Sequence, residues 1–138
     1  MALNTQLANA TVNGQGDNLA ARLNTGYLRI YSGTQPATAD TALSGNTLLA
    51  ELRFSATAAP ATSGGLITFN AITSGTAGNT GTASFFRALS SDGTTVVMDG
   101  SVGTSAANLV LNSVAISSGA TVSVSAFTHD VLNSSSGL

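Results

Sequence analysis

The sequence predicts an all-β protein whose strands form an antiparallel two-sheet sandwich or a barrel. From Tyr27 onward, short runs of β-branched and aromatic residues alternate with clusters of Gly, Asp, Asn, Ser and Pro. Only one passage, near residues 17–26, has the apolar spacing of a helix. The chain has 138 residues, which suits one domain with its own hydrophobic core. We therefore expect a single β-rich domain with one short helix.

The N-terminal part of the chain predicts an arm followed by this helix. Residues 1–16 are rich in Asn, Thr, Gln and Gly with scattered Leu and Val, a composition typical of an extended arm. Asp17 is then a candidate helix cap, and Gly26 lies just beyond the last expected turn. The predicted organisation is an arm over 1–16, a β-domain over 17–132 and a C-terminal tail over 133–138.

The expected strands follow in order, and the clearest local signal is a hairpin turn. Asp92-Gly93 separates two apolar runs and supplies the backbone freedom that a tight turn requires. The passage over 73–80 has no charged or aromatic residue and predicts a long surface loop. The predicted strands lie near 27–32, 47–55, 65–70, 82–90, 94–102, 107–112, 114–117 and 120–129.

Strict alternation of side chains predicts which residues of two strands face the core. In "LLAELRFSA" the core set contains four apolar residues at every second position: Leu48, Ala50, Leu52 and Phe54. In "TVSVSAFTHD" the same rule places Val122, Val124 and Ala126 on one face. Phe127 then falls on the opposite face.

A cluster of aromatic and cationic residues lies on the outer side of the first two strands. In "YLRIYS" Tyr27, Arg29 and Tyr31 alternate with apolar residues, and Arg53 takes the outer side of the next strand. Tyr and Arg are enriched where protein surfaces meet, so these four residues are the candidate protein–protein interface. The same pattern is compatible with a cross-strand pair between Arg29 and Glu51, or with a sugar-binding face.

The sequence contains few residues that carry chemistry, and we predict no catalytic, cofactor or metal site. His129 is the only histidine, Cys and Lys are absent, and the six acids are scattered. A lone histidine beside one acid on a strand does not build a catalytic triad, because adjacent strand residues point to opposite faces. Neither an enzyme nor a calcium site is favoured.

Charge and hydropathy restrict the partners. The formal net charge is −2 and the four arginines are not clustered, which disfavours nucleic-acid binding. Only 7% of residues are charged, which suits a protein packed against copies of itself or a partner. No run approaches a membrane-spanning helix, and the N-terminus is unlike a signal peptide, so we expect no membrane contact and synthesis in the cytoplasm.

Three segments together resemble a family of small proteins encoded in the structural gene clusters of tailed bacteriophages. They are "GYLRIYSGTQPA" at 26–37, "LLAELRFS" at 48–55 and "FRALSSDGTTVVMDGSVG" at 86–103, and the resemblance extends over about residues 17–130. Within this family the chain is most similar to the cement, or decoration, proteins of Bordetella-phage-type capsids. The shared motifs belong to strands and turns, so the resemblance transfers no catalytic residue.

The resemblance implies a jelly-roll domain that binds the outer surface of the phage major capsid protein shell and stabilises the head by bridging capsomers. It implies a homodimer with no enzymatic activity. On physical grounds the candidate dimer surfaces are the outer sheet face and an exposed edge strand, since an unpaired edge invites pairing. The expected location is the virion, assembled in the cytoplasm of the host bacterium. Two alternatives remain open: a tail or fibre module that binds a host surface carbohydrate, and, third, a glycan hydrolase.

Overall fold

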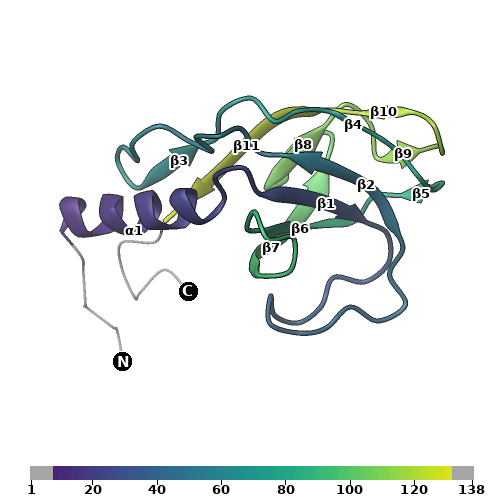
Figure 1. Ribbon diagram of the computed structural model, residues 1–138, viewed down its shortest axis with the longest axis horizontal. Helices are drawn as coiled ribbons and strands as arrows, with labels where there is room; N and C mark the ends of the chain where they lie inside the picture. The colour runs from purple at the N-terminus through teal and green to yellow at the C-terminus, as the bar shows by residue number, and fades with distance from the viewer. Residues whose placement is uncertain (1–7, 132–138) are drawn as a thin grey trace.

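One large β-sheet, two small two-stranded ribbons and a single helix form the regular structure of residues 8–131, the part of the chain that the computed structural model describes (Figure 1). The predicted tail over 133–138 lies outside the described residues. The elements in chain order are α1 (Asn9–Arg22), β1 (Tyr27–Tyr31), β2 (Leu48–Arg53), β3 (Leu66–Thr68), β4 (Gly75–Thr76), β5 (Gly81–Thr82), β6 (Phe85–Leu89), β7 (Val96–Gly103), β8 (Leu109–Leu111), β9 (Ala115–Ile116), β10 (Thr121–Val122) and β11 (Val124–Asp130).

The sheet confirms a β-rich fold but differs from two separate antiparallel sheets. Seven strands form one sheet in the order β2-β1-β6-β7-β8-β11-β3, and two small ribbons pair β10 with β4 and β5 with β9. Every pair in the large sheet is antiparallel except β7 and β8, which run parallel. This parallel contact joins only Val102 to Leu109 and Gly103 to Val110. The short contact links two antiparallel halves into one sheet.

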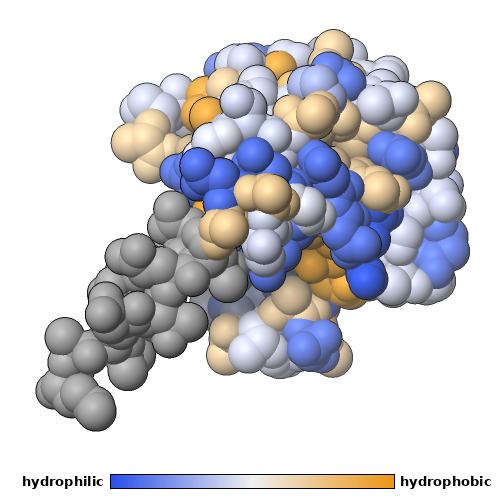
Figure 2. Space-filling view, turned by 90° about the vertical axis from the view of Figure 1, so that its left-hand side faces the viewer, coloured by the Kyte–Doolittle hydropathy of each residue, from blue (hydrophilic) through white to orange (hydrophobic). Residues whose placement is uncertain are grey.

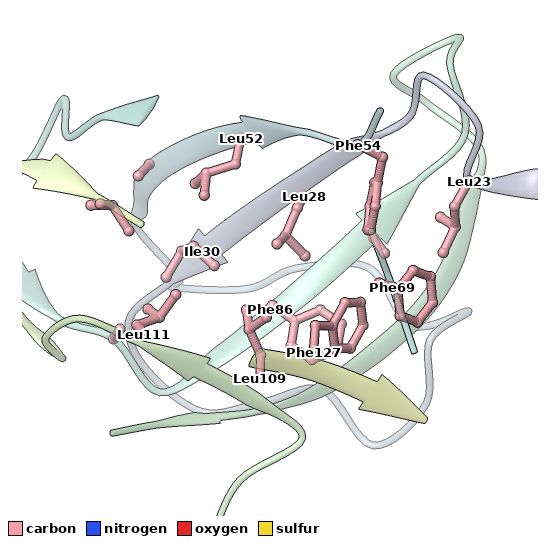
Figure 3. Close-up of a cluster of buried hydrophobic side chains, with 14 of the residues drawn as sticks. Leu23, Leu28, Ile30, Leu52, Phe54, Phe69, Phe86, Leu109, Leu111 and Phe127 are labelled. Atoms are coloured by element: carbon pink, nitrogen blue, oxygen red, sulfur yellow. The ribbon is translucent and has the colours of Figure 1, made fainter. Parts of the chain in front are cut away.

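The sheet curls so that its two halves pack against each other. Phe86 on β6 and Phe127 on β11 are separated in the sheet by β7 and β8, yet their rings meet edge to face at 5.1 Å between centroids (Figure 3). Phe69 stacks on Phe127 at 4.3 Å, and Phe54, just after β2, lies 6.2 Å from the same ring. Phe127 is therefore at the centre of the aromatic core that holds the halves together.

The helix is longer than predicted and begins earlier. It starts at Asn9, so residues 9–16 are helical, and the prediction of an extended arm over 1–16 is wrong for that part. Residues 1–7 lie outside the described residues. Asp17 is not the cap but an interior residue. The sequence signal was weak because two glycines and several Asn residues have low helix propensity, and no side chain caps the N-terminus.

Docking against the neighbouring segment 58–65 compensates for this low propensity. Asn13 and Asp17 on the helix, and Asn24 just beyond its C-terminal end, accept hydrogen bonds from backbone N–H groups of that segment at 3.1, 2.7 and 2.8 Å respectively. The side of the helix that packs inward is buried at Val12, Gly16 and Ala20. Tertiary contacts of both kinds stabilise a helix that would be marginal in isolation.

Gly16 permits the close approach of the helix, which leads to a testable prediction. A Cβ atom at Gly16 would lie 2.5 Å from Thr62 Oγ1, whereas a Cβ atom at Gly14 would meet nothing within 4 Å. We expect Gly16→Ala to lower the unfolding midpoint in urea although Ala is the better helix former. Gly14→Ala is the matched control and should raise stability by up to about 1 kcal/mol.

A second substitution separates steric overlap from other effects at Gly16. Thr62→Ala removes the two nearest atoms, and Thr62 Oγ1 is buried without a hydrogen-bond partner among the described residues. The double variant Gly16→Ala/Thr62→Ala should therefore recover most of the lost stability. Equal midpoints for the Gly16→Ala and Gly14→Ala variants would contradict the packing argument.

A β-bulge changes which residues of β2 face the core. The β1–β2 register pairs Ile30 with Ala50 but Tyr31 with Leu48, so Leu49 is an extra residue. Leu49 is fully buried and Leu48 is 37% exposed, which makes the predicted core position of Leu48 wrong. From Ala50 onward the predicted alternation holds.

A second bulge has the same effect on β11. The register shifts between Val124 and Ala126, so the alternation predicted through this strand does not persist. Ala126 is exposed and Phe127 is buried, the reverse of the prediction. The predicted strand over 120–129 is also divided into β10 and β11, and the predicted loop over 73–80 contains β4, the partner of β10.

The hairpin predicted at Asp92-Gly93 is confirmed. Strands β6 and β7 pair antiparallel on either side of it, and Gly93 has a φ of +73°, which favours glycine. The pKa of Asp92 is lowered to about 2 because the side chain and backbone of Thr95, together with the backbone of Thr94, donate hydrogen bonds to its carboxylate. Asp92 thus fixes the turn.

The side of the molecule that carries α1 has a mixed surface. Figure 2 shows hydrophilic and near-neutral residues over most of it, with smaller apolar areas between them. Within residues 8–131 no helix is long and apolar enough to cross a membrane.

Candidate protein interface

The outer face of β1 and β2 brings three of the four predicted interface residues together. The register places Tyr27 opposite Arg53 and Arg29 opposite Glu51. Arg29 Nε donates to Glu51 Oε2 at 2.7 Å, which confirms the cross-strand pair. Tyr27 and Arg29 are half-buried, while Glu51 and Arg53 are exposed. The face is therefore accessible in the isolated chain.

Tyr27 is contacted by two guanidinium groups. The Cζ atom of Arg53 lies 3.9 Å from the centroid of the Tyr27 ring, and that of Arg29 lies 5.6 Å away. Arg53 also donates to the backbone carbonyls of Thr25 at 2.7 Å and Gly26 at 3.4 Å. These contacts hold the Arg53 guanidinium over the ring and reduce the entropy it would lose in binding.

Tyr31 does not belong to this accessible face, which corrects the prediction. It is only 6% exposed, and its ring stacks on Phe85 at 5.3 Å between centroids. The chain between β1 and β2 folds back over this side of the sheet, where Thr41 O accepts a hydrogen bond from Arg87. The sequence does not reveal this covering loop, because its residues carry no alternating pattern.

Sequence reasoning also missed a buried ion pair on the same side of the sheet. Arg87 Nε and one Arg87 Nη donate to the two carboxylate oxygens of Asp99, both at 2.8 Å, and the side chains are 6% and 5% exposed. The pKa of Arg87 is raised by this hydrogen bonding to Asp99. The sequence did contain a signal for this pair, because Arg87 and Asp99 carry opposite charges and lie on the two strands of the predicted hairpin.

The two ion pairs form one row across four neighbouring strands. Arg29 lies opposite Glu51 on one side and opposite Arg87 on the other, and Arg87 lies opposite Asp99. Each arginine has its own carboxylate, so the two like charges at the centre of the row are compensated. Burial tends to lower the pKa of Arg29, but the hydrogen bond and charge attraction of Glu51, together with the contribution of Tyr31, outweigh burial and the pKa is raised.

The loop between β1 and β2 is fixed at its base as well as by Arg87. Asn46 Nδ2 donates to the carbonyls of Ser32 and Thr34 at 3.1 and 3.0 Å. Ser84 Oγ donates to Gly33 O. The loop therefore forms a fixed boundary to the accessible face formed by Tyr27, Arg29, Glu51 and Arg53.

The free edge of β2 is largely occupied by the chain's own backbone. Gly78 N donates to Leu49 O and Thr73 N donates to Arg53 O, both at 2.9 Å. Asn79 Nδ2 donates to Leu48 O at 2.8 Å. An edge covered in this way has fewer groups left for pairing with another strand. At this end of the sheet, the accessible face of β1 and β2 is therefore a better candidate for contact with a partner than the edge of β2.

Two hollows of the described chain each contain a single carboxylate. One, of about 230 Å³, lies between α1 and the segment 57–61 and includes Asp17; the other, of about 210 Å³, lies along β2 and includes Glu51. His129 is half-buried on β11, opposite Ile67 on β3. Over residues 8–131 no three His, Asp or Glu side chains gather into a possible metal site.

Comparisons of the chain with protein-family models, curated protein sequences and solved structures found no match.

Proposed function

We propose that this protein is a bacteriophage capsid cement protein with a jelly-roll-like domain, which binds the outer surface of the major capsid protein shell and bridges capsomers. The observation that carries the proposal is the accessible face on β1 and β2, where the guanidinium groups of Arg29 and Arg53 both lie near the Tyr27 ring. Aromatic and arginine side chains with restricted motion are the types that dominate binding energy at protein interfaces.

Two further features support a structural, non-enzymatic role. Only 7% of the residues are charged, which suits a protein that is packed against neighbours. The strand and turn segments at 26–37, 48–55 and 86–103 resemble those of phage structural proteins. Many copies of a small domain, acting as homodimers across capsomer boundaries, would stabilise a head even if each contact is weak, because the contacts act together.

The location of the protein in the particle tests the proposal. Particles produced by the genome that encodes this chain are imaged by cryo-electron microscopy. We expect density for the domain at many symmetry-related positions on the outer surface of the head. A few copies confined to the tail would contradict the cement function and favour the carbohydrate-binding alternative. Absence from the particles would contradict both.

A second prediction concerns the stability of the head. Heads assembled without this protein should release their DNA at a lower temperature than complete heads, because the contacts across capsomer boundaries are missing. Adding the purified protein back should restore the release temperature, measured with a DNA-binding dye during heating. Identical release temperatures with and without full occupancy would contradict a stabilising role.

A further inference from the structure

Arg53 differs from the other arginines of the accessible face and the buried row because no carboxylate neutralises it. Arg29 pairs with Glu51 and Arg87 pairs with Asp99, the only two ion pairs among residues 8–131. Arg53 instead faces Tyr27 and donates to two backbone carbonyls. The accessible face thus carries one net positive charge, although the whole chain carries −2.

The geometry leaves Arg53 ready to bind an anion. A guanidinium has more N–H donors than the two that Arg53 uses within the described chain, and its side chain is exposed. The Tyr27 ring and the carbonyls of Thr25 and Gly26 fix the plane of the group. A planar, oriented guanidinium is suited to two parallel hydrogen bonds with a carboxylate.

We propose that Arg53, supported by Tyr27, is the binding site for a carboxylate side chain on an acidic segment of the shell protein. The identity of this partner rests on the proposed function. A nucleic acid is a poor match, because phosphate binding of useful strength needs several clustered cations, whereas the chain has four arginines and two of them are paired with carboxylates. A single uncompensated guanidinium beside an aromatic ring matches one carboxylate of a protein.

Binding to emptied heads that lack this protein tests the site. The variants Arg53→Lys, Arg53→Gln and Arg53→Glu are compared with the unmodified protein at low and high salt. We expect affinity to fall in that order, with a loss of about tenfold or more for Arg53→Glu, as expected for a charge-assisted hydrogen bond. The loss for Arg53→Glu should shrink at high salt.

Arg22 offers a matched control. It is exposed, it has no carboxylate partner among the described residues, and its side chain donates only to Asn18, four residues earlier on α1. Arg22→Glu makes the same change in total charge as Arg53→Glu but should alter affinity less than about twofold, because exposed charges away from a contact contribute little. Equal losses for the two variants would overturn the site and indicate a general charge effect.

A second measurement does not depend on heads or on the folding of a charge-reversal variant. The isotopically labelled protein is titrated with an acetylated, amidated hexaglutamate peptide and with the corresponding hexaglutamine peptide, and NMR signals of Arg53 Nε–H and the Tyr27 ring are followed. We expect saturable shifts with hexaglutamate alone, and their loss in Arg53→Gln. No shift, or equal shifts with both peptides, would overturn the proposal.

The outcomes separate this inference from the proposed function. If the unmodified protein binds heads and Arg53→Glu binds equally well, the Arg53 site is overturned and the cement function stands. If the unmodified protein does not bind heads but Arg53 responds to hexaglutamate, the cement function and the assignment of the shell as partner are overturned, while the carboxylate chemistry is supported.

Discussion

Replacing Arg87 by Met should destabilise the domain by about 3–5 kcal/mol, because it leaves Asp99 buried without its counter-ion. The Asp99 side chain is 5% exposed, and both of its carboxylate oxygens accept hydrogen bonds from Arg87. The substitution also removes the donor to Thr41 O, which holds the loop between β1 and β2 against the sheet. We expect a large fall in the urea midpoint and increased amide exchange in that loop.

Two comparisons identify the cause of this loss. In Arg87→Met/Asp99→Leu both charges are removed, so most of the stability should return, since an apolar pair of similar volume avoids the cost of desolvation. Arg29→Met breaks the more exposed pair with Glu51, whose side chains are 26% and 39% exposed, and should cost no more than about 1 kcal/mol. A loss for Arg87→Met no larger than for Arg29→Met would show that burial does not determine the effect.

Phe127→Ala should have an effect of similar size, about 3–5 kcal/mol, because it leaves a cavity at the centre of the aromatic core. The Phe127 ring contacts Phe54, Phe69 and Phe86, which belong to different parts of the curled sheet (Figure 3). The prediction is measured by urea unfolding followed by near-ultraviolet circular dichroism, which reports on the packing of the aromatic rings.

Two substitutions on the same strand provide the comparison for Phe127. Phe127→Leu retains much of the apolar volume and should cost less than Phe127→Ala. Ala126→Ser changes the exposed neighbouring position and should lie within about 0.5 kcal/mol of the unmodified protein. If Ala126→Ser proved more costly than Phe127→Ala, the bulge in β11 and the burial of Phe127 would both be wrong.

Local patterns in the sequence predict most of the strands and the clearest turn. The Asp92-Gly93 hairpin follows from the conformational freedom of glycine and the hydrogen bonds of aspartate, both of which act within a few residues. The Arg29–Glu51 pair follows from alternation on two neighbouring strands. These features depend on short-range chemistry, so they can be read from residue order.

The accessible face is only partly predictable, because short-range patterns place its residues on a side of the strand but do not show which of them become buried. Tyr27, Arg29 and Arg53 lie where alternation places them, since the register from Tyr27 to Ile30 is regular. Tyr31 also alternates with apolar residues, but it is buried and stacks on Phe85, and the loop that follows it bonds to Arg87 on the same side of the sheet. No local pattern indicates which part of a sheet face a loop will cover, because that depends on where the loop's polar groups find partners.

The sequence by itself determined a β-rich chain, the positions of its main strands, the Asp92-Gly93 turn and the outward side of Tyr27, Arg29 and Arg53. Only the tertiary structure decided the registers at the two bulges, which bury Leu49 and Phe127, and the extension of α1 back to Asn9. In β11 the bulge turns Phe127 inward in place of the smaller Ala126, which increases the apolar area buried in the core. In β2 the bulge buries the consecutive residues Leu49 and Ala50, which a regular strand would place on opposite faces. A helix of low propensity forms when another segment supplies its contacts, as residues 58–65 do here.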